Sequence, residues 1–139
     1  MANISKVAEA INPGQSGTSS LVVSPEHTAA KVGSGVIPVL ATPVMINVIE
    51  AAALACAEHL LPPRHQSLGV RLDVSHIAAT PVGMKITAEA IVTKVEGRTV
   101  HFRVTCNDEK ELIGEGTHER VIVNVDRFEE RVRRKLEGL

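Results

Sequence analysis

ATPVMINVIEAAALACAEHLL, residues 41–61, is the stretch that decides how this chain folds. Thr42 is predicted to cap a helix with its hydroxyl, Pro43 suits the first helical position, and Pro62 with Pro63 ends the helix. Almost every residue between these signals is apolar, so the helix needs cover on nearly all sides. About 18 residues rise roughly 27 Å, which is marginal for a membrane span, and we interpret the segment as a core helix.

One carboxylate, Glu50, lies in the middle of this apolar helix. An unpaired carboxylate is costly to bury, so Glu50 needs either a buried partner or a function. The stretch 67–77 alternates apolar with polar or small residues, which predicts a strand with one buried face. His76 continues the apolar phase that runs from Leu68 to Val74. If no bulge precedes His76, it faces the helix and Glu50, and this pairing favours catalysis over a structural carboxylate.

The remaining segments complete an α+β pattern. They predict a strand at 18–23, a loop at 27–39, strands at 84–92, 100–106 and 112–125, and a last helix capped by Asp126. Residues 1–17 are expected to be a flexible N-terminal segment before a single domain at 18–139. One helix in the hollow of a curved antiparallel sheet, the hotdog fold, accounts for this order. One sheet cannot cover such a helix completely, so we expect a homodimer.

Composition excludes several classes of function. The 139 residues carry a formal net charge of −1 and only two aromatic side chains, so neither a basic footprint for nucleic acid nor a base-stacking platform is indicated. Cys56 and Cys106 lie in apolar surroundings and form no metal-ligand spacing. With no signal-peptide pattern at the N-terminus, the expected location is the cytoplasm, without membrane attachment.

Several short motifs together resemble the fluoroacetyl-CoA thioesterase family. They are AT at 41–42, Glu50, SLG at 67–69, VSH-x-AATP at 74–81, VEGR at 95–98 and GTHER at 116–120. Each motif is weak alone, but their order and spacing match over about residues 18–135. The resemblance implies a homodimeric hotdog enzyme that hydrolyses a small acyl-CoA thioester, with pairing of dimers left open. It implies no metal and no cofactor beyond the coenzyme A of the substrate.

The resemblance also implies a set of site residues. Thr42, Glu50 and His76 match the family's catalytic positions, and Gly69 and Arg120 match positions near the acyl group. A glycine at position 69 also lets a thioester approach backbone N–H groups, as an oxyanion hole requires. Glu50 acts either as a nucleophile or as the base that activates water, and the sequence does not separate the two.

The loop before the helix departs from the family pattern. The fluoroacetyl-specific enzyme carries phenylalanines there as a lid, whereas this chain has Gly33 and Val36 in the substrate-binding loop. We therefore expect altered specificity. Two other functions stay open: a hotdog hydratase or dehydratase, and a non-catalytic acyl-CoA binding module. Asp73 lies on the strand face opposite His76, which argues against the hydratase, and a binding module has no need of Glu50.

Overall fold

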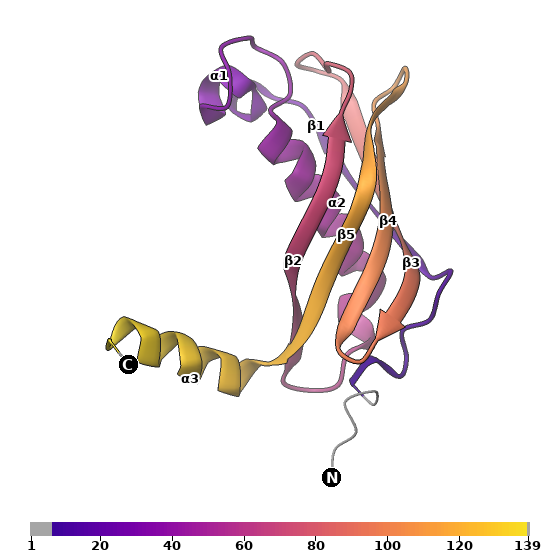
Figure 1. The fold of residues 1–139 in the computed structure, drawn as a ribbon. Helices are drawn as coiled ribbons and strands as arrows, with labels where there is room; N and C mark the ends of the chain where they lie inside the picture. The colour runs from indigo at the N-terminus through magenta and orange to yellow at the C-terminus, as the bar shows by residue number, and fades with distance from the viewer. Residues whose placement is uncertain (1–6, 139) are drawn as a thin grey trace.

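A five-stranded antiparallel sheet curls around helix α2 in the computed structural model, which describes residues 7–138 (Figure 1). The strands are β1 (Ser16–Val22), β2 (His65–His76), β3 (Lys85–Glu96), β4 (Thr99–Asn107) and β5 (Leu112–Asn124). The helices are α1 (Ala29–Val32), α2 (Thr42–Ala57) and α3 (Val125–Leu136), with 3-10 turns at Pro25–His27 and Glu58–Leu60. The spatial order β1-β3-β4-β5-β2 makes β1 and β2 the sheet edges. The predicted α+β hotdog architecture is confirmed.

The N-terminal part of the chain packs earlier than the sequence indicated. Ala8 and Ile11 are buried in the core, and β1 begins at Ser16. Packed structure therefore starts ahead of residue 18, and the rest of the predicted flexible segment, residues 1–6, lies outside the described residues.

Helix α2 begins differently from the prediction. Ala41 is its N-cap with ψ 140°, so Thr42 and Pro43 are the first two helical residues. The prediction that Thr42 caps the helix was wrong, because its side chain forms no cap hydrogen bond. The Thr42 hydroxyl instead forms a hydrogen bond with His76, the last residue of strand β2. The helix ends at Ala57, and a 3-10 turn carries the chain on to Leu60.

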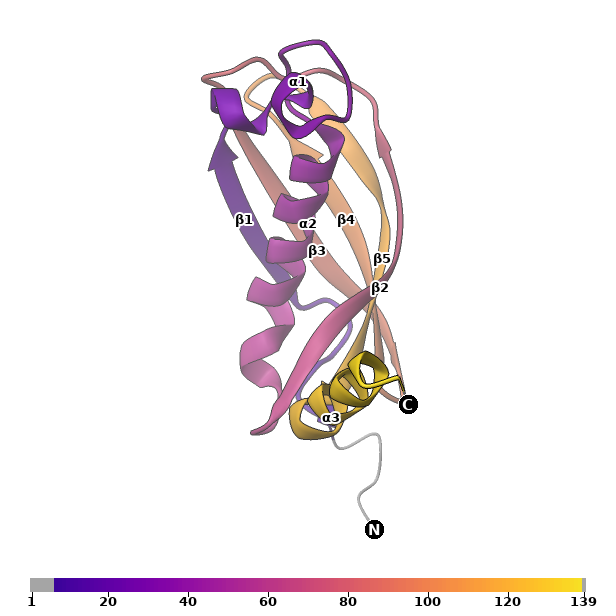
Figure 2. The same ribbon diagram turned by 90° about the vertical axis from the view of Figure 1, so that its left-hand side faces the viewer.

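One side of α2 is buried and the other is open. The helix packs mainly on β1 and β3, so closely that a Cβ at Gly17 would collide with the α2 backbone at Cys56. Its buried residues are Met45, Val48, Ile49, Ala52, Ala53, Cys56 and Ala57. On the other side Asn47, Leu54 and Ala55 are exposed. Figure 2 shows α2 running in front of the sheet. By length and hydropathy, Thr42–Leu60 would suffice for a membrane span, but its inner face covers the sheet.

Strand β2 contains a bulge that the sequence did not indicate. Its register against β5 shifts between Gly69 and Arg71. Consequently Leu68 lies on the outer face, contrary to the prediction, whereas Gly69 faces α2. After the bulge, the predicted phase holds, because Leu72 pairs with the buried His118 and the strand ends at His76 on the helix side. The bulge therefore brings Gly69 and His76 to the same face.

Helix α3 extends from the end of β5 beyond the β2 edge of the sheet (Figure 1). Its N-cap is Asn124, whose side chain accepts a hydrogen bond from the Arg127 N–H at 3.1 Å. Asp126, predicted to be the cap, lies within the first turn and forms an ion pair with Arg64. The cap lies two residues before the predicted position, because β5 ends at Asn124 and the helix begins directly after it. No residue of α3 is buried, so the helix adds little to the core.

Candidate active site

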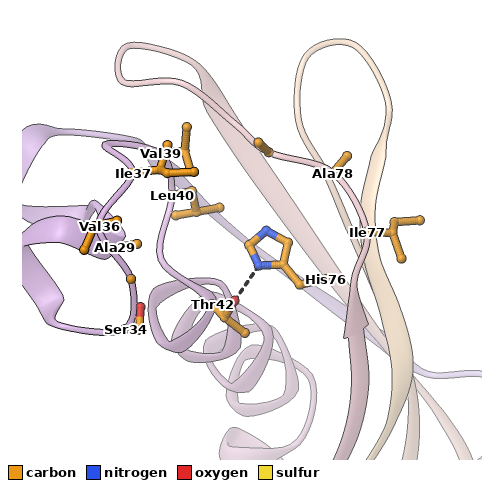
Figure 3. Close-up of a pocket in the computed structure, with 12 residues that line it drawn as sticks. Ala29, Ser34, Val36, Ile37, Val39, Leu40, Thr42, His76, Ile77 and Ala78 are labelled. Atoms are coloured by element: carbon orange, nitrogen blue, oxygen red, sulfur yellow. Dashed lines mark hydrogen bonds between the residues drawn. The ribbon is translucent and has the colours of Figure 1, made fainter.

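Thr42 and His76 form the first half of the candidate site. Thr42 Oγ1 and His76 Nδ1 lie 2.7 Å apart and share a hydrogen bond (Figure 3). The other ring nitrogen, Nε2, is buried and has no hydrogen-bond partner among residues 7–138. Burial lowers the pKa of His76, because the imidazolium loses solvation. His76 is therefore neutral near pH 7, with a ring nitrogen free for a ligand.

A cavity of about 440 Å³ opens beside this pair. Apart from Thr42 and His76, its lining comes from the segment before α2 and from the chain after β2: Ala29, Ser34, Gly35, Val36, Ile37, Val39, Leu40, Ile77, Ala78 and Ala79. Figure 3 shows the residues before α2 on one side of the cavity and His76 on the other. The wall is mostly apolar, as a small acyl group requires.

The segment in front of α2 is a short helix followed by an exposed loop. Gly33 ends α1 with φ 95°, in the left-handed region that favours glycine, and it does not line the cavity. Val36 does line the cavity but is 89% exposed. This side of the cavity is therefore open to solvent, as the missing lid aromatics predict.

Glu50 forms the second half of the site with residues of β5. Its carboxylate accepts a hydrogen bond from Arg120 at 3.3 Å, and His118 Nε2 lies 4.0 Å away. The Glu50 side chain is 34% exposed, so a single chain does not bury it fully. The expected contact between Glu50 and His76 is not found. Thr42 takes the place beside His76, and eight residues of helix, a rise of about 12 Å, separate Thr42 from Glu50.

Arg120 is held by a buried network that the sequence analysis missed. Its Nε donates to Ser67 Oγ at 2.8 Å, and another of its nitrogens donates to the Ser67 carbonyl at 3.0 Å. Ser67 in turn donates its hydroxyl to Glu58 at 2.6 Å. Arg120 itself is only 5% exposed. These bonds fix the guanidinium plane, so that it presents a fixed donor to Glu50.

His118, also missed as a functional candidate, completes this arrangement. Its Nδ1–H donates to the Arg71 carbonyl at 2.8 Å, which leaves Nε2 to accept from Arg120 at 3.1 Å. The ring stacks on Phe102, and burial, with the nearby Arg120 charge, lowers its pKa. A neutral His118 therefore positions Arg120. The signal was present in the sequence, because His118, Arg120 and Ile122 share one face of an alternating strand.

Gly69 lies directly against the Glu50 carboxylate. A Cβ at this position would lie 2.6 Å from Glu50 Oε2 and 3.1 Å from His118 Cε1. The missing side chain thus leaves room next to the carboxylate, where the β2 backbone is also interrupted by the bulge. Among residues 7–138, no group of three His, Cys, Asp or Glu side chains is placed to hold a metal ion.

The sequence and the fold match those of known proteins. The family model described as fluoroacetyl-CoA-specific thioesterase matches residues 23–126. The chain is 39% identical over 97 residues, 70% of each sequence, to the fluoroacetyl-CoA thioesterase of Streptantibioticus cattleyicolor. A solved structure of a fluoroacetyl-CoA thioesterase superposes with a TM-score of 0.85 at 34% identity, covering 90% of this chain and 97% of the other. A thioesterase superfamily member from Thermus thermophilus gives 0.86 at 31% identity, covering 92% and 95%. The chain belongs to the fluoroacetyl-CoA-specific thioesterase family.

Proposed function

We propose that this protein hydrolyses the thioester of a small acyl-CoA to the free acid and coenzyme A. The observation that carries the proposal is the Glu50 carboxylate, held by Arg120 and facing the open space at Gly69. Family membership supports the same reaction class. The cavity beside Thr42 and His76 supplies an apolar place for an acyl group.

Two routes fit this carboxylate. Glu50 attacks the thioester carbonyl to give an anhydride that water then hydrolyses, or it takes a proton from a water molecule that attacks directly. In both, the carbon–sulfur bond breaks, the thiolate receives a proton, and water supplies one oxygen atom. In the base route this oxygen enters the product acid, whereas in the anhydride route it enters Glu50 when water attacks the glutamyl carbonyl, and the acid leaves with an oxygen from Glu50. The backbone at the Val70 bulge, which lacks a regular ladder partner, is our candidate for binding the carbonyl oxygen.

Arg120 and His76 have different roles in this proposal. Arg120 orients Glu50 through a fixed hydrogen bond and reaches the acyl group only where a ligand displaces part of that contact. His76, neutral and hydrogen-bonded to Thr42, exchanges a proton with the leaving thiolate or the attacking water through Nε2. The Thr42 hydroxyl fixes the ring that performs this step.

A homodimer brings these separated groups together. Strand β2 is a sheet edge, and its Val70 is 59% exposed. The face of α2 that carries Asn47, Leu54 and Ala55 is also open. Such an edge pairs readily with a copy of itself. Antiparallel pairing of two β2 strands brings the His76 end of one strand toward the Gly69 end of the other. His76 of the partner subunit then lies beside Gly69 and Glu50.

The first test is turnover of short acyl-CoA thioesters by the wild-type protein and by Glu50→Gln. We expect hydrolysis by the wild type and a loss of about 10²–10⁴-fold in the variant, because the amide retains the shape but is neither base nor nucleophile. Single turnover in oxygen-18 water separates the routes, since only the nucleophile route leaves label in Glu50. Tight acyl-CoA binding without turnover would indicate a binding module, and hydration of an enoyl-CoA would indicate a hydratase.

Mixing inactive variants tests the shared site. Coexpressed Glu50→Gln and His76→Ala chains should regain about a quarter of wild-type activity, because half of the dimers are mixed and each has one intact site. Sites contained within one chain would regain nothing. Light scattering that gives the 14.8 kDa monomer at micromolar concentration would refute the dimer itself. The two buried free cysteines are consistent with the cytoplasmic location we propose.

A further inference from the structure

Thr80, in the connection between β2 and β3, is a polar residue that is 0% exposed. It belongs to the motif at 74–81, of which only His76 has a place in the proposed mechanism. The Thr80 hydroxyl donates a hydrogen bond to the Asp108 carboxylate at 2.9 Å. A buried hydroxyl requires such a partner, and an ionised acceptor makes the bond stronger than a bond between neutral groups. This bond links the β2–β3 connection to the β4–β5 turn.

Asp108 is itself held in place within the β4–β5 turn. The carboxylate oxygen that does not bind Thr80 accepts the N–H groups of Lys110 at 2.8 Å and Glu111 at 2.9 Å. Desolvation by burial raises the pKa of Asp108, but the N–H groups of Lys110 and Glu111 and the Thr80 hydroxyl outweigh it and lower the pKa below its ordinary value. Thr80 therefore donates to a fixed carboxylate that is ionised at neutral pH.

The backbone of Thr80 joins the two walls of the cavity beside Thr42 and His76. Its carbonyl accepts the Leu40 N–H at 2.9 Å, and the next residue, Pro81, forms an isolated β-bridge with Val39. Val39 and Leu40 line one wall of the cavity, and residues 77–79, directly before Thr80, line the other. Thr80 does not itself line the cavity, so it acts on the walls and not on a ligand.

This junction lies close in the chain to both partners of the hydrogen bond between Thr42 and His76. Leu40 is two residues before Thr42, and Thr80 is four residues after His76. The two partners come from separate elements, because Thr42 begins α2 and His76 ends β2. Their contact of 2.7 Å requires both segments to stay in place, since a hydrogen bond is lost once its atoms are about 3.6 Å apart or poorly aligned.

We infer that Thr80, anchored by Asp108, is a positioning residue for the proposed hydrolysis, which fixes the segment before α2 against the chain after β2 and so maintains the contact between Thr42 and His76. The inference rests on the proposed function. The hydroxyl bond to Asp108 fixes the position of the Thr80 carbonyl, and that carbonyl fixes the position of Leu40 just before α2. Packing in the exposed loop that contains Val36 gives this segment little other support.

Two substitutions of Thr80 test the role of the hydroxyl. Thr80→Val keeps the size of the side chain and removes the donor, whereas Thr80→Ser keeps the donor. We expect kcat for a short acyl-CoA to fall at least about tenfold in Thr80→Val, because a displacement of about 1 Å at reacting groups costs on the order of 10²-fold. KM should stay within about threefold, and Thr80→Ser should retain at least about half of the wild-type kcat. A change confined to KM, or an equal loss of kcat in Thr80→Ser, would overturn the inference.

A destabilised control separates positioning from loss of stability. Ile11 is buried in the segment before β1, which lies at the opposite end of the molecule from α1 (Figure 1). Ile11→Val removes one buried methylene group and should lower Tm by about 4 °C, comparably with Thr80→Val. In assays below both Tm values, Ile11→Val should keep kcat within twofold of the wild type. An equal loss of kcat in the two variants would identify general destabilisation as the cause and overturn the inference.

The His76 ring reports on the same contact without turnover. Its titration by NMR, assigned with His76→Gln, should give a pKa below 6.5 in the wild type, because the ring is buried. Thr80→Val should move this pKa toward 6.5 as the wall loosens and water reaches the ring, whereas Thr80→Ser and Ile11→Val should leave it unchanged. Because the titration uses no substrate, this shift would support the positioning role even in a protein that hydrolysed no acyl-CoA. An unchanged His76 pKa in Thr80→Val would overturn the inference whatever the activity.

Discussion

Gly69→Ala is the substitution for which the structure predicts the sharpest separation of activity from stability. The new Cβ would lie 2.6 Å from Glu50 Oε2, whereas ordinary contact begins at 3.4 Å. The carboxylate oxygen must therefore retreat by about 0.8 Å, away from its hydrogen bond with Arg120. A displacement of about 1 Å at a reacting group costs on the order of 10²-fold in rate, or about 2.7 kcal/mol.

The same substitution should leave the fold nearly intact. The closest atom is the far end of a flexible side chain, and the next, His118 Cε1 at 3.1 Å, has to yield by only a few tenths of an ångström. We expect a cost of about 1 kcal/mol, a shift in Tm of about 4 °C. Gly116→Ala is the contrasting control, because its Cβ would collide with the β2 backbone at Asp73, which cannot move without breaking the strand pairing.

The assay is release of the CoA thiol, followed with a thiol-reactive chromophore, together with thermal unfolding by circular dichroism. Gly69→Ala should lose about 10²-fold in kcat with little change in Tm, and Gly116→Ala should unfold at a much lower temperature. Turnover of Gly69→Ala within threefold of wild type would refute the reasoning. A loss of Tm as large as that of Gly116→Ala would show that Gly69 is needed for folding instead.

Three further predictions concern His76, His118 and the open segment before α2. His76→Ala should lower kcat and kcat/KM together by at least about 10²-fold, measured with the best short acyl-CoA, and a change confined to KM would remove it from the chemistry. Burial lowers the pKa of both histidines below the ordinary histidine pKa of 6.5, so near pH 6.5 only the unfolded chain takes up these protons. The free energy of unfolding should therefore decrease as the pH falls through 6.5. Urea unfolding at about pH 8 and about pH 5.5 should show this loss, and His118→Gln should reduce it. Val36→Phe should raise the ratio of kcat/KM for fluoroacetyl-CoA to kcat/KM for acetyl-CoA from a low wild-type value, by up to about 200-fold. An unchanged ratio would show that specificity resides elsewhere. Gly33 has a φ of 95° and does not accept the same change.

Local patterns predicted the helix and the long strands because these elements are specified by residues next to one another in the chain. The apolar run of α2 and the period-two alternation of β3, β4 and β5 each appear within a single segment. The errors lie at element ends. Thr42 and Asp126 both have the chemistry of an N-cap, but each lies one or two residues inside its helix, where neighbouring strands fix the turn.

The bulge at Val70 could not be predicted from the strand itself. The alternation of apolar and polar residues continues through the bulge, because Leu68 is apolar although it lies on the outer face of the sheet. The shift becomes visible only against β5, where Gly69 pairs with Arg120 but Leu72 pairs with His118. The partners of Glu50 were missed for the same reason, since a strand pattern gives the face of His118 but not the strand it lies beside.

The incomplete cover of α2 by the sheet accounts for both the open side of the helix and the separation of Glu50 from His76. Helix α2 packs on β1 and β3, and its face next to β2 is left uncovered by the sheet. On that side lie the exposed part of Glu50 and the unpaired edge of β2. In the dimer that we propose, a second copy pairing along β2 would cover apolar surface that is costly to leave in water, and the same contact would supply the His76 that Glu50 lacks within its own chain. In this arrangement, stability favours dimers, and only dimers contain a complete site. An active monomer would separate these two consequences and contradict the argument.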